Sequence, residues 1–333
     1  MSVDEDAPTD ADLWPKLVFE FDGKGGGREI AAAEFEAHPS EAPEGGFMWI
    51  HLQHGVASTD EFLAAGGLDE FIVEALTAVE TRPRCTVHGD GALVNLRGVN
   101  PTPEGQPDVM ISVRLWIDQK RVIGVWVRAL NAVVDLIEAA RRGHAPMTPG
   151  DFVARLALRL ADRAEPVTAE LNERVDALEE ALLEEGVAPS RIELADVRQT
   201  AIGLRRFMFP QRDALSTMQI EDLPWLTPTD RSRLREAADR VTRLGEELDA
   251  IRDRAEVIHD QIMDRRADLL GRRTLLLSIV AALFLPMSLL SGMMGMNVAV
   301  PGADFLPAFW VVSGLMVLIA VIQFGIFKLF KLI

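Results

Sequence analysis

An asparagine that follows a long apolar run is the residue in this sequence best placed to select an ion. Asn297 comes directly after Gly295 and Met296, at the end of a run from Thr274 to Met294 that holds no charge in 21 residues. Its side chain offers a carbonyl oxygen and an amide group, and the glycine lets the backbone come close to a symmetry axis. Repeated around such an axis, these amides would form a neutral ring that hydrogen-bonds the water shell of a divalent cation without removing it. The sequence therefore predicts a selectivity motif at residues 295–297.

The apolar run before this motif carries a stripe of small and weakly polar residues. Its members are spaced alternately four and three apart, which places them on one face of a helix. They are Thr274, Ser278, Ala281, Leu285, Ser288 and Gly292. Such a stripe can serve close helix packing in lipid or line a pore, and the motif that follows it favours pore lining. The candidate gates are Leu277, Leu285 and Met294, which could close a path by dewetting, and Leu285 also lies on the stripe.

A second apolar run, residues 306–327, holds no charge in 22 residues. About 20 residues suffice to cross a bilayer, so 274–294 and 306–327 are predicted membrane spans joined by an outer loop at 295–305. Arg272 and Arg273 precede the first span, and Lys328 and Lys331 lie in the tail 328–333. The positive-inside bias predicts a multi-pass protein of a bacterial inner membrane with both ends in the cytoplasm. Because a two-span hairpin cannot enclose a path, transport would require several copies around an axis.

The composition excludes several classes of function. The net charge is −17, and Asp304 is the only one of the 51 acidic residues that lies after residue 273. An acidic soluble part argues against nucleic-acid binding and would suit the concentration of cations near a pore, although it also serves solubility. Cys85 is the only cysteine, so no intrachain disulfide can form. No hydrolase, metalloprotease or nucleotide-binding motif is present, so we expect neither an enzyme nor a resident cofactor.

The chain before the spans predicts a mixed α and β domain. Residues 1–13 are rich in Asp, Pro and Thr and are expected to be disordered, and residues 14–150 form the cytoplasmic α/β domain. Gly23–Gly27 lacks the ending of a phosphate-binding loop and is predicted to be a hairpin turn. Strands are expected at Leu17–Phe21, Phe47–Leu52, Cys85–His88, Ala92–Gly98, Asp108–Ile117 and Arg121–Val127, and helices at Ala32–Ala37 and Asp60–Leu76.

Residues 151–227 predict a helical hairpin. Asp151 is the expected cap of a first helix that bends or restarts at Pro166. Ser190 and Glu193 match a capping box that opens a second helix, which is expected to stop near Pro210.

Residues 228–273 predict a long stalk helix, which starts after Thr227 with a proline in its first turn. If it continues into the first span as far as Met293, its 66 residues extend roughly 100 Å and form one rod between the soluble domain and the pore lining. Such a rod could transmit gating movements or serve only as a scaffold for oligomerisation. Its apolar heptad positions are Leu234, Val241, Leu248, Ala255, Ile262 and Leu269, with Ala237, Leu244, Ile251 and Ile258 between them.

Several other residues could bind metal. Asp253 and Asp260 belong to a group of stalk carboxylates that could form sites between neighbouring rods, although solvation and pairing with arginines explain them better. Asp304 could attract cations at the outer mouth or be an ordinary loop residue. Cys85 and His88 are spaced as a C-x-x-H pair, but strand alternation points them to opposite faces, so a structural role is expected. Two further histidines, His51 and His54, are expected at the surface.

Several segments resemble the CorA superfamily of divalent-cation transporters. The resemblance rests on Phe284-Leu285-Pro286 and on Gly295-Met296-Asn297 at the end of the same span, although Met294 stands where family members usually have Tyr. The continuation Val298–Gly302 is similar to the ZntB branch, which is associated with zinc. Further segments that resemble this branch are Arg82–Gly91, Leu96–Asn100 and Leu204–Arg212.

This resemblance implies a funnel-shaped homopentamer whose cytoplasmic domain is an α/β/α sandwich. It also implies transport of zinc, with nickel, cobalt and cadmium as further candidates, and coupling to protons. A CorA-type magnesium channel is the alternative within transport. A membrane-tethered coiled-coil scaffold or sensor is the alternative from another class. The expected partners are further copies of the chain, membrane lipid and divalent cations.

Overall fold

The computed structural model describes residues 16–31, 35, 42–78, 82–100, 110–184, 189–296 and 308–329. These residues form two compact units, which divide within one helix between Ile258 and His259. The stretch 1–13, expected to be disordered, lies outside the described residues, as does the helix expected at Ala32–Ala37 apart from Phe35.

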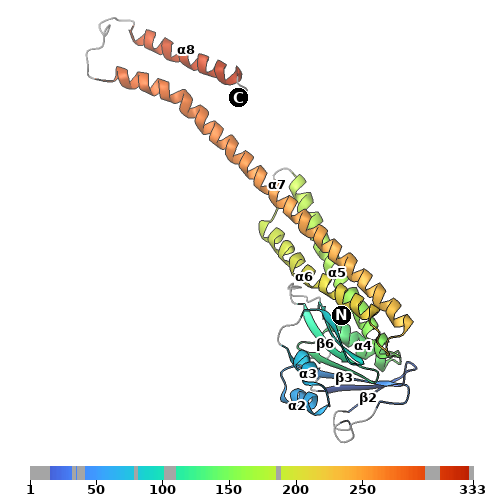
Figure 1. The fold of residues 1–333 in the computed structure, drawn as a ribbon. Helices are drawn as coiled ribbons and strands as arrows, with labels where there is room; N and C mark the ends of the chain where they lie inside the picture. The colour runs from blue at the N-terminus through green and yellow to red at the C-terminus, as the bar shows by residue number, and fades with distance from the viewer. Residues whose placement is uncertain are drawn as a thin grey trace, which may run out of the picture. The chain divides into compact units, whose positions relative to one another are not determined.

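The first unit is built on a seven-stranded sheet with the order β2-β1-β3-β7-β6-β5-β4 (Figure 1). β3 and β7 are parallel, and the other neighbouring pairs are antiparallel. Six strands match the predicted pieces, whereas β2 was not predicted, and the turn at Gly23–Gly27 joins it to β1. The strands are β1 (Lys16–Phe21), β2 (Gly27–Ile30), β3 (Phe47–Gln53), β4 (Arg84–His88), β5 (Gly91–Gly98), β6 (Ile111–Ile117) and β7 (Arg121–Trp126).

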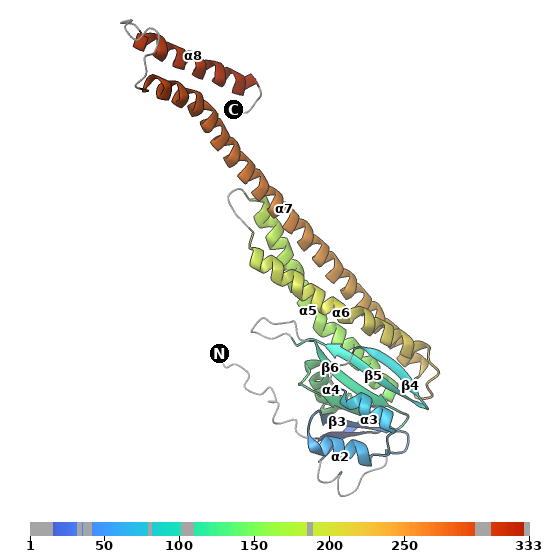
Figure 2. The ribbon, with the colours of Figure 1, turned by 60° about the vertical axis from the view of Figure 1, so that its left-hand side comes forward.

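Strand alternation gives the sheet an apolar layer on each face. On one face, Ile50 and Ile123 pack with Leu76 of α3 (Glu70–Thr77), next to α2 (Ala57–Ala65). On the other face, the centre of the Trp49 ring lies 4.8 Å from that of Phe152 in α5 (Pro149–Leu183), and α4 (Asn131–Arg141) covers the same side (Figure 2). The unit is therefore the predicted mixed α and β domain with helices on both faces. The helix expected at Asp60–Leu76 is two helices, because α2 ends at Ala65 and Gly67 has a positive φ of 66°.

Two long helices follow, α5 (Pro149–Leu183) and α6 (Arg191–Ile220). The prediction for the start of α5 was wrong: Thr148 is the cap, and its hydroxyl accepts from the backbone N–H of Asp151 at 2.8 Å. The start of α6 is confirmed, because the Ser190 hydroxyl accepts from the N–H of Glu193 at 3.2 Å.

The two prolines inside these helices end neither of them. The prediction that the second helix stops near Pro210 was wrong, and the first helix does not restart at Pro166, where a bend or a restart was predicted. α5 continues through Pro166 and α6 through Pro210. A proline leaves the carbonyl four residues earlier without its helical donor, here at Asp162 and Arg206. Both of these residues are exposed, so water can supply the missing hydrogen bond and the packing of the rest of the helix prevails.

α7 (Pro228–Met294) is one helix of 67 residues, so the predicted stalk continues through Pro286 to the end of the first apolar run. At its start, Thr227 N donates to Asp230 Oδ2 at 3.1 Å and Asp230 N donates to Thr227 Oγ1 at 3.2 Å, the reciprocal bonds of a capping box. Arg254 joins α7 to α5 by donating to the two carboxylate oxygens of Glu179 at 2.9 and 2.7 Å. In the first unit all the heptad positions are buried: Leu234, Ala237, Val241, Leu244, Leu248, Ile251, Ala255 and Ile258.

The second unit holds the rest of α7 together with α8 (Ala308–Leu329). Both helices are long and apolar enough to cross a membrane, judged by length and composition. They lie side by side in both views (Figures 1 and 2). The heptad position Leu269 is exposed here, so the last part of the repeat is not buried within one chain.

Candidate functional site

The predicted stripe lies on the face of α7 that α8 leaves uncovered. Thr274, Ser278, Ala281, Leu285, Ser288 and Gly292 are all exposed in the single chain. The buried and half-buried side chains of the same stretch are Ile279, Leu283, Pro286, Met287 and Leu290. At about 100° per residue, this second set is centred roughly opposite the stripe. The structure therefore brings the six predicted lining residues together on one free face.

The gate candidates are spread along the predicted span of α7, with Leu277 near its start and Met294 at its end, directly before the motif. Leu277 and Leu285 are 72% and 73% exposed, and Met294, the last residue of the helix, is 50% exposed. Gly295 N donates to the carbonyl of Ser291 at 3.0 Å, which continues the helical pattern by one residue. Asn297 and Asp304 lie outside the described residues.

A proline and an amide side chain meet where α8 packs on α7. Gln323 Nε2 donates to the backbone carbonyl of Ala282 at 2.9 Å. In an uninterrupted helix that carbonyl would accept from the N–H of residue 286, which is a proline and has none. Sequence reasoning missed Gln323, although a lone primary amide in an apolar span was a signal that could have revealed it.

The stalk carboxylates form no metal centre within the chain. Among the described residues, no group of three or more His, Cys, Asp or Glu side chains is arranged to hold a metal ion. Asp253 accepts from Arg252 at 2.7 Å, and both it and Asp260 are exposed. Asp249 pairs with Arg205 of α6 and with Arg252 at 3.1 Å. Within one chain these acids therefore follow the predicted alternative of solvation and pairing with arginines.

Cys85 and His88 point to opposite faces of β4, as strand alternation predicted. The ring of His88 stacks on Phe71 of α3, and its Nε2 lies 3.7 Å from a carboxylate oxygen of Asp69. Cys85 lies on the α6 side, where burial and the nearby charge of Glu221 raise the pKa of its thiol to about 12. The two side chains cannot ligate one metal ion.

The expectation that His51 lies at the surface was wrong. It is buried on the α4 side of the sheet, where its ring stacks on Trp126 with centroids 5.8 Å apart. Burial lowers the pKa of this imidazole to about 3, so it stays neutral. β3 lies inside the sheet and is covered on both faces, so alternation does not give it an exposed side. His54 is half-buried, and its Nε2 lies 2.8 Å from the carbonyl of Thr77.

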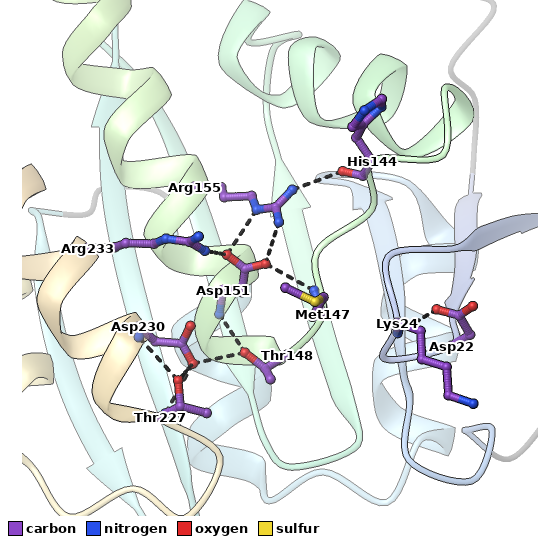
Figure 3. Close-up of polar contacts among 10 residues, drawn as sticks. All are labelled: Asp22, Lys24, His144, Met147, Thr148, Asp151, Arg155, Thr227, Asp230 and Arg233. Carbon is purple, nitrogen blue, oxygen red and sulfur yellow. Dashed lines mark hydrogen bonds and ion pairs between the residues drawn. The ribbon is translucent and has the colours of Figure 1, made fainter.

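The starts of α5 and α7 are tied together by buried carboxylates, shown in Figure 3. Asp230 accepts from the Thr148 hydroxyl at 2.9 Å and from the Thr227 hydroxyl at 2.7 Å. Asp151 accepts from Arg155 at 2.7 Å, from Arg233 of α7, and from the N–H of Met147 at 3.1 Å. This network fixes the long helix to the sheet domain at its first turn.

These features together define a class of protein. A soluble α and β domain, one long helix that leaves it, and an apolar pair of helices are the architecture of a membrane protein with a soluble N-terminal part. The chain belongs to the family described as CorA-like Mg2+ transporter protein, whose model matches residues 44–329. The resemblance inferred from the sequence is thereby confirmed, and so is the expectation that the chain is not an enzyme.

Relatives match nearly the whole chain. The divalent cation transporter CmaX of Pseudomonas aeruginosa is 35% identical over 313 residues, which are 92% of this chain and 93% of that protein. The zinc transport protein ZntB of Pectobacterium carotovorum is 35% identical over 289 residues, 86% of each chain.

Two solved structures are similar to this chain over nearly its whole length. The full-length CmaX structure has a TM-score of 0.82 at 34% identity and covers 96% of this chain and 97% of its own. The CorA magnesium transporter of Methanocaldococcus jannaschii has a TM-score of 0.76 at 17% identity, covers 94% and 97%, and shows the shared fold.

Proposed function

We propose that this protein moves divalent metal cations across a membrane as a homo-oligomer, along a path lined by the stripe of α7. The position of α8 carries the proposal, because it packs against one face of α7 and leaves the stripe on the other. A helix face turned to lipid gains nothing from hydroxyls and small residues, whereas close packing between copies and a path for a hydrated ion both use them. Membership of a transporter family supports the same conclusion.

The assembly we propose is the funnel-shaped homopentamer that the CorA resemblance implies. One hairpin offers one lining helix, so the path must be completed by copies of the same face around an axis. The exposed Leu269 supports this, because a heptad position left open in one chain is suited to contact a neighbour. Asn297 of each copy would then meet at the outer mouth and select the ion, with Leu285 as the apolar constriction.

Zinc is the ion we favour, with nickel, cobalt and cadmium as further candidates and coupling to protons. Identity of 31–35% to proteins named for zinc transport supports this choice. CmaX, at 35%, carries only the broader name of a divalent cation transporter. A magnesium channel is the second candidate, which the description of the matching family favours.

The test is metal flux into proteoliposomes that contain the purified full-length protein. Zinc and magnesium are compared at equal concentration, with and without an imposed pH gradient. We expect zinc to enter faster and an acidic outside to raise its rate. Faster magnesium entry without pH dependence would instead establish the magnesium channel.

A scaffold or sensor anchored by the hairpin is the rival from another class. Asn297→Ala separates the two, because transport needs the amide and an anchor does not. We expect flux to fall at least about tenfold while the oligomer survives, measured by its mass in detergent. Asn172→Ala, which removes the same side chain from an exposed position of α5, is the matched control and should keep most of the flux. Unchanged flux in Asn297→Ala would remove the selectivity ring from the proposal.

A further inference from the structure

Gln323 stands out in α8 as a primary amide in a helix that is otherwise almost entirely apolar. An amide group placed in hydrocarbon costs free energy unless its N–H groups find an acceptor. Gln323 finds one outside its own helix, the carbonyl of Ala282 in α7, at a distance of 2.9 Å.

The acceptor is the one backbone carbonyl whose helical donor Pro286 removes. In an α-helix the N–H of residue i donates to the carbonyl of residue i−4, and residue 282 is four residues before residue 286. Pro286 has no N–H, and its ring also crowds that carbonyl. Gln323 therefore supplies from α8 the donor that α7 lacks.

The other two prolines inside helices show why this replacement matters here. Pro166 and Pro210 leave open the carbonyls of Asp162 and Arg206, which belong to exposed residues of the soluble unit where water can donate. The apolar part of α7 is predicted to lie in lipid, which has no donor to offer. A side chain from a neighbouring helix is the remaining source.

The hydrogen bond from Gln323 to Ala282 also lies next to the gate candidate of α7. Ala282 and Pro286 bracket Leu285, the gate candidate on the stripe, and the bend that a proline permits would turn the stripe above it relative to the stripe below. We propose that Gln323 is a positioning residue for the transport path. It holds α7 at its proline by donating to Ala282 and so fixes the direction in which Leu285 and Ser288 face. This inference rests on the proposed function.

The experiment is a double-mutant cycle on the full-length protein, with Gln323→Leu, Pro286→Ala and the two combined. Flux of zinc and of magnesium is measured per folded oligomer, together with the thermal midpoint of the oligomer in detergent. Ser313→Ala, which removes a polar group from the same helix, is the control. In the wild-type background, Gln323→Leu should lower flux about three- to tenfold and change the zinc-to-magnesium ratio. In the Pro286→Ala background the restored N–H satisfies Ala282, so Gln323→Leu should change flux less than about twofold.

Three outcomes would overturn the inference. Equal losses in both backgrounds would mean that Gln323 does not act through the open carbonyl. An unchanged flux per folded oligomer with a lowered midpoint would reduce Gln323 to a structural contact. If the wild-type protein transported neither cation, the proposed function itself would fail. The thermal midpoints of the same four proteins would still show whether positions 286 and 323 are coupled.

Discussion

The hydroxyl of Thr148, at the start of α5, donates to Oδ2 of Asp230 in the first turn of α7, at 2.9 Å (Figure 3). The two residues are each part of a helix cap, so one carboxylate serves both helix starts. Asp230 is only 3% exposed, and Thr148 and Thr227, which donate to it, are half-buried. The attachment of the long helix to the soluble domain therefore depends on this carboxylate.

We expect Asp230→Ala to lower the free energy of unfolding by about 2 kcal/mol, because it removes a cap and leaves the half-buried donors of Thr148 and Thr227 without their acceptor. Asp239→Ala, an exposed acid on the same helix, should change it by less than about 0.5 kcal/mol. Tryptophan fluorescence during unfolding of the detergent-solubilised protein measures both. Equal stability of the two variants would show that the shared cap contributes nothing.

Gly150 gives a second test of the same junction, because a side chain there would enter the space of Asp230. An added Cβ would lie 2.6 Å from Asp230 Oδ2 and 2.9 Å from Leu226 Cδ1, closer than packed atoms come. We expect Gly150→Ala to destabilise the protein by about 1–3 kcal/mol. Gly203→Ala is the matched control, since no atom lies within 4 Å of the added carbon in α6, and it should be neutral or stabilising by up to about 1 kcal/mol. Similar midpoints for both variants would contradict the packing of the two helix starts.

His51 predicts how stability depends on pH. Its pKa is lowered to about 3 in the folded protein, against 6.5 for a free histidine. Below pH 6.5 the unfolded chain therefore binds a proton at this histidine, whereas the folded protein does not. Stability contributed by the neutral ring is complete above pH 6.5 and is lost as the pH falls from there towards 3. This loss should reach about 2 kcal/mol between pH 7 and pH 5. His51→Phe should lack that part of the slope, whereas His144→Gln, at an exposed histidine, should keep it; parallel profiles for the wild type and His51→Phe would refute the assignment.

Most helices and strands could be predicted from the sequence where the apolar residues recur with a clear period. Six strands follow from alternation, and the stalk part of α7 follows from heptad spacing and from the absence of proline between Pro228 and Pro286. β2 was missed because Gly27-Arg28-Glu29-Ile30 is polar and short, as an edge strand can be. Pro166 and Pro210 were overrated as helix breaks, because tertiary packing and solvent access at Asp162 and Arg206 are not visible in local propensity.

The part of the candidate site that lies on one helix was predictable from the sequence, whereas the contacts between helices were not. Spacing placed six stripe residues on one face, but it could not tell that α8 would cover the opposite face. Gln323 and Pro286 lie 37 residues apart in sequence, and only the packing of two helices shows that one supplies the donor missing from the other. Metal sites between copies depend on an assembly that no single chain contains.

The uncovered stripe predicts which positions of α7 water can reach. Cys85 makes the test simple, because its thiol pKa of about 12 keeps it almost fully protonated and slow to react near neutral pH. We expect Ser278→Cys and Ser288→Cys to react in proteoliposomes with a charged, water-soluble methanethiosulfonate, and flux to be lost as they do. Ile279→Cys and Leu283→Cys, on the face that α8 covers, should react at least about tenfold more slowly and keep their flux. If the two pairs reacted equally fast, or if only the second pair did, the stripe could not line the path and α7 would have to be turned by half a revolution in the assembly.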